Sequence, residues 1–236
     1  MEIEPIAHFR SPFPDKFGIP RQAGLSPSVR GQIVFEPGFR SADAVRGLEG
    51  FDYIWLIWGF SANSERYSRP AVGEITAPAD KTRFQPTVRP PRLGGNERVG
   101  VFASRSPFRP NSLGLSAVKL ESVEEGPVIN VLGADLMDGT PIYDIKPYVA
   151  YADSHPDARS GFVDEKDWEP LEVSFPDSPL PEGLDADALR EVLSQDPRPR
   201  YHSDPKKVYG MYYGGFEIRF RVEGGTVQVV SIEKIH

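Results

Sequence analysis

The sequence predicts a mainly-β protein, either a barrel or a sandwich, on three observations. Short runs of β-branched and aromatic residues recur along the chain and are separated by turn signals. The connections are rich in residues that end strands, with 24 prolines and 22 glycines among 236 residues. The sequence contains neither a GxGxxG segment between a strand and a helix nor a P-loop, which argues against a parallel nucleotide-binding fold.

The first sixty residues predict three strands and one short helix. Strands are expected at 3–9 and 31–35, and Ser41 is expected to cap a brief helix in SADAVRGL. The run FDYIWLIWGF at 51–60 is aromatic and β-branched almost throughout, which predicts a strand buried on both faces. Residues 61–85 follow as an irregular insertion.

The middle of the chain predicts further strands on either side of a loop rich in arginine and proline. Short apolar runs place these strands at 99–103, 115–123 and 128–132. The last strand leads into ADLMDGTPIYDIKPYV, where Asp138-Gly139 is a strong turn signal.

The last third of the chain predicts a strand at 171–175, a helix at 185–194 and a hairpin around Gly224-Gly225. We therefore expect three regions: a domain at 1–150, an acidic, proline-rich linker at 151–184, and a small α+β domain at 185–236.

Composition excludes several functional classes. The chain has no cysteine, which removes disulfides, thiolate nucleophiles and thiolate metal ligands. Its four histidines show no ligand spacing, so we expect no metal site. No apolar run reaches the roughly 18 residues that span a bilayer, and the N-terminus has no secretory pattern. These features predict a cytoplasmic protein that uses neither metal nor membrane.

The net charge of −7 is unevenly distributed. Residues 152–196 contain 13 acids and three bases, so the remainder of the chain is positive by three charges. Residues 81–110 hold seven Lys and Arg side chains against one acid, Glu97. This basic stretch is a candidate surface for anions such as nucleic-acid phosphates.

Three loops combine glycine and proline with polar groups: PRQAGL (20–25), ASRSPFRPNSLGLS (103–116) and DLMDGTPIYDIKPY (135–148). Each follows or joins a strand, so a compact barrel would bring them to one rim, as a scaffold presents binding loops. The alternative is that Asp138-Gly139 is only a turn and that the arginines are only solvated.

Four segments carry a resemblance to a known family: KFGIPRQAGL, ADAVRGLEGFDYIW, RPPRLGGNERVGVFASRSPFRPNSLGLS and DLMDGTPIYDIKPY. They are similar to segments of the TsaA/TrmO family, tRNA methyltransferases that act on threonylcarbamoyladenosine next to the anticodon. DPRPRYH (196–202) and YGMYYGGFEIRFRV (209–222) resemble that family's small C-terminal domain. The resemblance implies a single-sheeted β-barrel that binds S-adenosylmethionine, a tRNA anticodon loop as partner, and a homodimer.

The same resemblance implies a set of cofactor-binding positions. They lie in the three loops and at the end of the aromatic strand: Ala23, Gly24, Leu25, Ser61, Ala62, Arg105, Leu115, Asp138, Gly139, Thr140 and Pro141. At Ser61 and Ala62 the sequence departs from the family, because small residues stand where the family has larger polar ones.

The implied reaction requires alignment of the acceptor nitrogen, the methyl group and the sulfonium sulfur. The carbamoyl group withdraws the lone pair of the acceptor, so either a base removes its N–H or nearby cations stabilise the developing anion. Asp138, Lys146 and Tyr148 are the candidate catalytic groups, and a reaction without a dedicated base stays open.

Substrate contacts are expected from arginine and lysine side chains. Arg92 or Arg109 can bind the threonyl carboxylate in a bidentate manner, although Arg109 and Asn111 are equally suited to stiffening their own loop. In the C-terminal region we expect phosphate contacts from Arg200, Lys206 and Lys207. Arg219 and Arg221 belong to the same candidate phosphate surface, with the alternative that they only occupy the outward positions of an amphipathic strand.

Two rival functions remain compatible with the sequence. The same barrel could methylate another RNA or a small molecule, or the chain could be a non-enzymatic RNA-binding module. The sequence does not identify the tRNA species, a shared site across a dimer interface, or the role of the insertion at 61–85.

Overall fold

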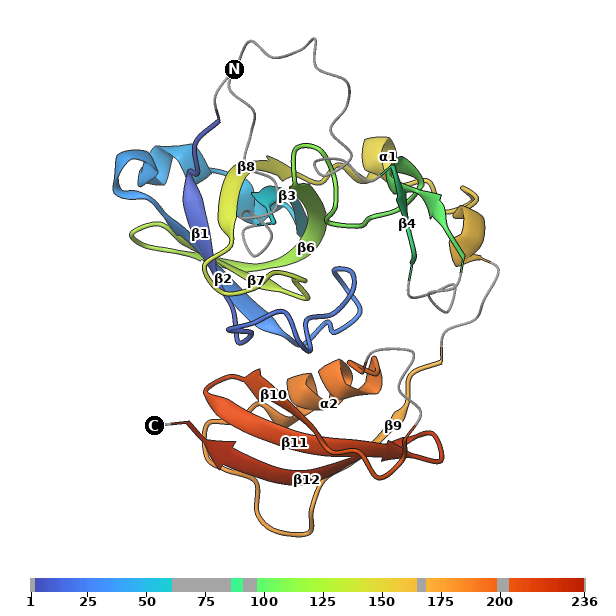
Figure 1. Ribbon diagram of the computed structural model, residues 1–236. Helices are drawn as coiled ribbons and strands as arrows, with labels where there is room; N and C mark the ends of the chain where they lie inside the picture. Colours follow the sequence, from blue (N-terminus) through green and yellow to red (C-terminus); the bar gives the residue numbers. More distant parts are fainter. Residues whose placement is uncertain (1–2, 61–85, 91–96, 165–168, 199–203, 236) are drawn as a thin grey trace, which may run out of the picture.

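A computed structural model describes residues 3–60, 86–90, 97–164, 169–198 and 204–235. Its N-terminal part is a closed antiparallel barrel with the strand order β1-β2-β7-β6-β3-β8, which confirms the predicted mainly-β barrel (Figure 1). The strands of this barrel are β1 (Ala7–Arg10), β2 (Arg30–Phe35), β3 (Tyr53–Gly59), β6 (Leu113–Glu124), β7 (Val128–Leu132) and β8 (Pro141–Pro147).

Side chains that alternate between the inner and outer faces of each strand fill the interior of the barrel. Ile54, Leu56 and Trp58 of β3 point into the core, whereas Tyr53 is 44% exposed. The expectation that β3 is buried on both faces is therefore wrong, because one face of the barrel wall is turned away from the core. Ile33 of β2 and Ile129 of β7 complete the same apolar core.

Two expected elements differ in type. The segment predicted as a strand at 99–103 forms only β5 (Val99–Gly100), which pairs with β4 (Thr87–Val88) and passes into a 3-10 turn, Val101–Ala103. The expected helix after Ser41 is also a 3-10 turn, Ala42–Val45, and Ser41 makes no capping hydrogen bond with its side chain. Further short helical turns are Pro37–Phe39, Leu48–Gly50, Gly161–Val163 and α1 (Ala150–Asp153).

The C-terminal part is a four-stranded sheet with one helix packed on it (Figure 1). Its strands are β9 (Glu172–Ser174), β10 (Tyr209–Tyr213), β11 (Phe216–Glu223) and β12 (Thr226–Lys234), and its helix is α2 (Ala186–Ser194). β11 and β12 form the predicted hairpin, and Asp185 caps α2 by accepting a hydrogen bond from the Ala188 N–H. β9 pairs in parallel with β12, so a strand from the expected linker belongs to this sheet.

The loop at 11–29, between β1 and β2, joins the two parts. Phe13 is fully buried in the same apolar core as α2 and β10–β12. The Pro12 carbonyl accepts a hydrogen bond from Gly214 N–H at 2.9 Å. Glu191 of α2 accepts hydrogen bonds from both the backbone N–H and the hydroxyl of Ser28. A loop of the barrel is therefore part of the core of the C-terminal domain.

Gly18 of this loop packs closely against Met211 of the C-terminal sheet. Its φ of +94° is one that glycine adopts readily, and a Cβ added there would overlap the side chain of Met211, which is 1% exposed. We expect Gly18→Ala to lower the free energy of unfolding by about 1–3 kcal/mol, because it combines backbone strain with overpacking.

The measurement is urea denaturation beside Gly38→Ala. A Cβ on Gly38 meets no atom within 4 Å, so this control should leave stability unchanged or raise it by up to about 1 kcal/mol. Equal unfolding free energies in the two variants would contradict the packing of Gly18 on Met211.

Candidate functional site

A cavity of about 710 Å³ lies against β3 and β6. Its wall is completed by residues from the loop at 16–23, the loop at 104–109 and the segment 135–140. The volume falls in the range of small-molecule sites, roughly 300–1,000 Å³. The cavity is therefore the place where the described part of the chain can accommodate a cofactor.

The three loops singled out in the sequence meet at this cavity. Ala23, Arg105 and Thr140, one from each loop, all line it. Backbone hydrogen bonds tie two of the loops to segments next to the others: Gly24 N–H donates to the Gly133 carbonyl and Asp138 N–H to the Phe13 carbonyl, each at 2.8 Å. The convergence expected at one rim of the barrel is what the structure shows.

The predicted cofactor residues divide into three groups. Ala23, Arg105, Leu115 and Thr140 line the cavity. Among the described residues, the remaining ones stand beside the lining without being part of it: Gly24, Leu25, Asp138, Gly139 and Pro141. Ser61 and Ala62 lie outside the described residues.

Arg105 bridges two of the loops. Its Nη1 donates a hydrogen bond to Gln22 Oε1 at 3.0 Å, and its charge acts on the carboxylate of Asp135. The arginine therefore has its guanidinium at the cavity, between the loop at 16–23 and the segment 135–140.

Arg109 supports its own loop. Its Nη1 donates to the carbonyls of Val101 at 3.2 Å and Ser104 at 2.7 Å, and its guanidinium lies 5.6 Å from the centre of the Phe102 ring. It also lines the cavity. These hydrogen bonds suit the loop-stiffening role considered for Arg109, and its contact with substrate stays a prediction.

The other predicted substrate residues are separate from the cavity or lie outside the described residues. Asn111 is exposed and stands apart from the lining, and Lys206 and Lys207 precede β10 in the C-terminal domain. Lys207 has its Nζ 5.3 Å from the centre of the Tyr209 ring. Arg92 and Arg200 fall in the ranges that the structure does not describe.

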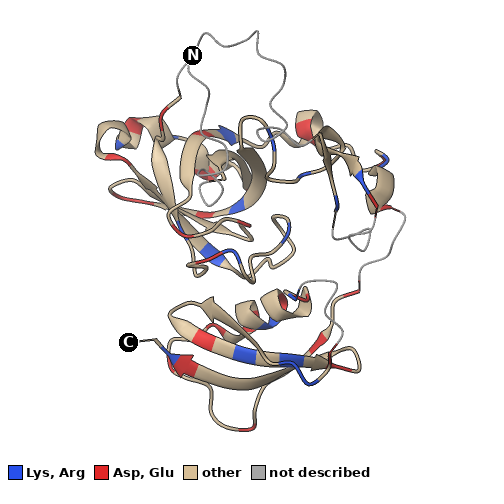
Figure 2. Ribbon diagram, viewed as in Figure 1, with Lys and Arg blue, Asp and Glu red and all other residues tan. Residues whose placement is uncertain are grey.

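Charges on the C-terminal sheet are mixed in sign, as Figure 2 shows along β11. Arg219 and Arg221 occupy the exposed positions of this strand, which confirms their outward alternation. Arg219 pairs with Glu217 at 3.1 Å, and Arg221 donates to Gln228 at 2.8 Å.

Only one of the three candidate catalytic groups lines the cavity. Asp138 accepts a hydrogen bond from Ser11 N–H and pairs with Arg10 at 3.5 Å, and Lys146 pairs with Asp144 at 2.8 Å. Tyr148 does line the cavity, with its ring centre 5.6 Å from that of Trp55. An aromatic pair is thus part of the cavity wall.

Asp135 also lines the cavity, although it is not among the predicted site residues. Ser116 Oγ donates to Asp135 Oδ1 at 2.6 Å, and Trp58 Nε1 donates to Ser116 Oγ at 3.0 Å. Burial raises the pKa of Asp135, and hydrogen bonds from Ser116 and from backbone N–H groups, with the charge of Arg105, oppose the rise. One signal was present in the sequence: Ser116 is a polar residue at an inward position of β6, between Gly114 and Val118.

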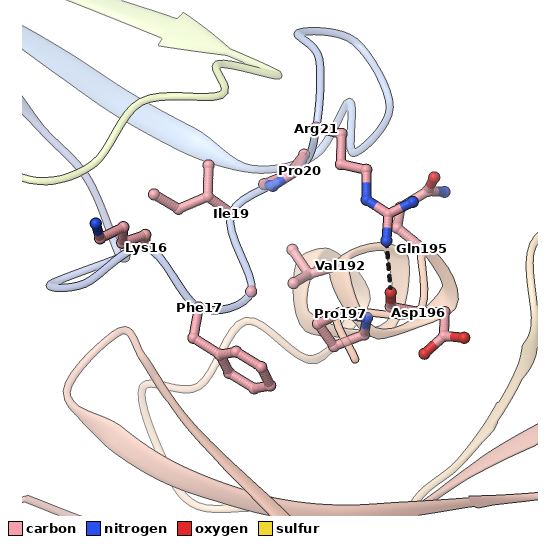
Figure 3. A pocket seen from close by; sticks show the side chains of 10 residues that line it. Lys16, Phe17, Ile19, Pro20, Arg21, Val192, Gln195, Asp196 and Pro197 are labelled. Carbon is pink, nitrogen blue, oxygen red and sulfur yellow. Dashed lines mark hydrogen bonds between the residues drawn. The ribbon is translucent and has the colours of Figure 1, made fainter. Parts of the chain in front are cut away.

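A second, smaller cavity of about 200 Å³ lies between the loop at 16–21 and the end of α2 (Figure 3). Lys16, Ile19, Pro20 and Arg21 line both cavities. In Figure 3 the Arg21 side chain reaches the end of α2, where it donates a hydrogen bond to the Asp196 carbonyl at 3.5 Å. One short loop therefore separates the cofactor-sized cavity from the domain junction.

Within the described ranges, no group of three or more His, Asp or Glu side chains is arranged to hold a metal ion. No helix of the described part is long and apolar enough to cross a membrane.

The chain matches both domains of one family. The tRNA-methyltransferase O N-terminal domain matches residues 8–154, and the TrmO C-terminal domain matches residues 179–235. The tRNA (adenine(37)-N6)-methyltransferase of Escherichia coli K12 is 39% identical over 245 residues, covering 98% of this chain and 97% of that protein. A human protein of the same name is 37% identical over 153 residues, 64% of this chain and 31% of that protein.

Two further matches of this chain are to proteins of Pseudomonas aeruginosa. RcsF, provisionally named as an S-adenosylmethionine-dependent methyltransferase, is 39% identical over 219 residues, 89% of this chain and 87% of that protein. A crystal structure of TrmO from this organism has a TM-score of 0.75 and 30% identity, covering 99% of this chain and 97% of that one.

The contacts of Arg109 generate a prediction about stability. We expect Arg109→Ala to lower the free energy of unfolding by about 1.5–3 kcal/mol, because it removes charge-assisted hydrogen bonds to two carbonyls of a partly buried loop. Urea denaturation is the measurement, with Asn111→Ala as the exposed control, expected to stay within about 0.5 kcal/mol of the unmodified chain. If Arg109→Ala is as stable as this control, its hydrogen bonds do not hold the loop.

Proposed function

Because the chain belongs to the tRNA-methyltransferase O family, we propose that it transfers the methyl group of S-adenosylmethionine to the exocyclic nitrogen of adenosine 37 in tRNA. The acceptor in this proposal carries a threonylcarbamoyl group and lies next to the anticodon. The observation that supports the proposal best is that both family domains match in order between residues 8 and 235, over a cavity of cofactor size.

The residues of the cavity fit this cofactor. The methionine end of the cofactor carries a carboxylate, and the cavity offers a cation, Arg105, to pair with it. Trp58, Leu115 and Met137 provide apolar surface for the adenosine. We propose that Ala23, Arg105, Leu115 and Thr140 contact the cofactor, and Gly24, Leu25, Asp138, Gly139 and Pro141 remain predicted contacts.

The bound cofactor supplies an activated methyl group, and the chain supplies alignment and charge. The cavity wall carries four cations, Lys16, Arg21, Arg105 and Arg109, against two acids, Asp135 and Asp153. This excess of positive charge favours a phosphate-bearing substrate with a threonyl carboxylate. Trp55 and Tyr148 offer ring faces on which a splayed base of the anticodon loop can stack.

The remaining parts of the proposal concern assembly and location. We propose that residues 1–150 form the methyltransferase domain and that residues 185–236 contact the tRNA, with Arg200, Lys206 and Lys207 meeting phosphates. We also propose a homodimer in the cytoplasm, where tRNA is found. Phe102 is 70% and Leu115 58% exposed beside the cavity, and a partner subunit could cover them.

The substrate is tested by methyl transfer from labelled S-adenosylmethionine to two tRNA preparations, with and without threonylcarbamoyladenosine. We expect label only in the first, resolved by mass spectrometry as a methylated threonylcarbamoyladenosine. Label in both tRNAs would retain the methyltransferase and discard the modified nucleoside as its substrate. Failure to bind the cofactor, with RNA affinity intact, would favour the RNA-binding module.

The cofactor position is tested by calorimetry on Arg105→Ala. Removing the guanidinium should weaken S-adenosylmethionine binding about 10- to 100-fold, as expected for a charge-assisted hydrogen bond. Arg98→Ala is the matched control, because Arg98 donates to Thr87 Oγ1 and stands apart from the cavity lining. Equal affinities in the two variants would show that the cofactor lies elsewhere.

A further inference from the structure

The proposed reaction leaves a proton to be removed, and this inference rests on that proposed function. The acceptor nitrogen carries a hydrogen, and its lone pair is withdrawn by the adjacent carbonyl, so attack on a methyl group is slow while the N–H bond is intact. A group at the cavity that accepts the proton would raise the rate.

The cavity wall offers few titratable groups that can take up a proton. The four cations Lys16, Arg21, Arg105 and Arg109 donate hydrogen bonds and have no acceptor atom. The carboxylates are Asp135 and Asp153, and Tyr148 contributes a hydroxyl. The choice therefore lies among three side chains of the described lining.

Asp153 is the weaker base of the two carboxylates. It accepts hydrogen bonds from Val149 N–H at 2.8 Å and from Trp55 Nε1 at 3.0 Å. These bonds lower the pKa of Asp153, and they hold its carboxylate against the start of α1.

We propose that Asp135 accepts the proton of the acceptor nitrogen. Its carboxylate is at the cavity wall and is fixed by the hydrogen-bond chain Trp58–Ser116–Asp135, with lengths of 3.0 and 2.6 Å. Gly114 leaves room for the indole ring of Trp58, because a Cβ at position 114 would overlap it. Ser116 occupies one lone pair of Oδ1, and a carboxylate has about four such sites, so capacity for a proton remains.

The surroundings of Asp135 suit this role. Burial raises the pKa of Asp135 toward the neutral range. A general base works best when its pKa lies in that range. Ser116 on β6, the N–H of Ala23 in the loop and the charge of Arg105 act against this rise in the pKa of Asp135.

The step balances in atoms and electrons. Asp135 takes the hydrogen of the acceptor N–H as a proton, and the nitrogen lone pair forms the new bond to the methyl carbon. The bond between that carbon and sulfur breaks, and its electron pair stays on sulfur, which becomes a neutral thioether. The protonated Asp135 returns its proton to water after the product leaves.

The test uses the full-length protein with threonylcarbamoyladenosine tRNA and S-adenosylmethionine. Asp135→Asn keeps an oxygen for Ser116 and removes the base, so kcat should fall about 10²- to 10⁴-fold while calorimetry shows much less change in cofactor affinity. Circular dichroism and urea denaturation check that the variant folds.

A second variant reports on the acid limb of the pH–rate profile. Activity falls with decreasing pH as Asp135 is protonated. Ser116→Ala removes a hydrogen bond that lowers the pKa of Asp135, so the acid limb should move to higher pH. Ser122→Ala, on the same strand and bonded to Asn130 Nδ2, is the control and should leave the limb in place.

The outcomes separate this role from the proposed function. A wild-type chain that labels neither tRNA overturns both. If the wild type is active, three results overturn the role of Asp135 alone. The first is that Asp135→Asn keeps its kcat, and the second is that its kcat and its cofactor affinity fall together. The third is that the acid limb of the pH–rate profile stays in place in Ser116→Ala and disappears in Tyr148→Phe.

Discussion

Pairing of β1 with β8 closes the barrel, and the position of the site depends on this closure. Ala7 lies opposite Ile142, and Ile6 N–H donates to the Ile142 carbonyl at 2.8 Å. Closure places the end of β1 beside the turn that precedes β8, where Gly139 N–H donates to the Phe9 carbonyl at 2.8 Å. Segments more than a hundred residues apart thereby share one cavity wall, and closure also leaves the barrel without a free sheet edge.

The loop at 11–29 connects the C-terminal domain to the wall of the larger cavity. Phe13 is buried with α2 and β10–β12, whereas Ala23, ten residues further on, lines the larger cavity. A buried aromatic side chain contributes several kcal/mol of packing, of the order of 3–5 for its removal, so the loop is held firmly at one end. The C-terminal domain therefore does more than add surface for RNA: its core is one of the supports of the candidate cofactor site.

Local pattern was enough to predict the elements with strong signals. The run at 128–132 became β7 with the same bounds, and Gly224-Gly225 turns the hairpin of β11 and β12. Val99 to Ala103 was mistaken for a strand because its apolar residues favour β structure, whereas the chain there has only β4 as a partner and turns after two residues. The loops were chosen correctly, but Asp135 was not, because its partner Ser116 comes from β6, and only the paired strands reveal that contact. For Arg109, the sequence leaves two roles open, and the structure adds hydrogen bonds to carbonyls of its own loop that no local pattern could predict.

The chemistry of the proposed cofactor explains why a barrel without a glycine-rich fingerprint can serve it. Such fingerprints place phosphates at the N-terminus of a helix, where free N–H groups and the helix dipole attract negative charge. S-adenosylmethionine has no phosphate. It needs a cation for its carboxylate and apolar surface for its adenine, and side chains of the cavity wall supply these as well as a helix does. Arg105 stands on a loop of this cavity and Trp58 on β3 in its wall, so the cation and the apolar surface are both attached to the closed sheet. The rigidity that a Rossmann domain obtains from helices packed on a parallel sheet is obtained here from barrel closure and from the buried loop at 11–29.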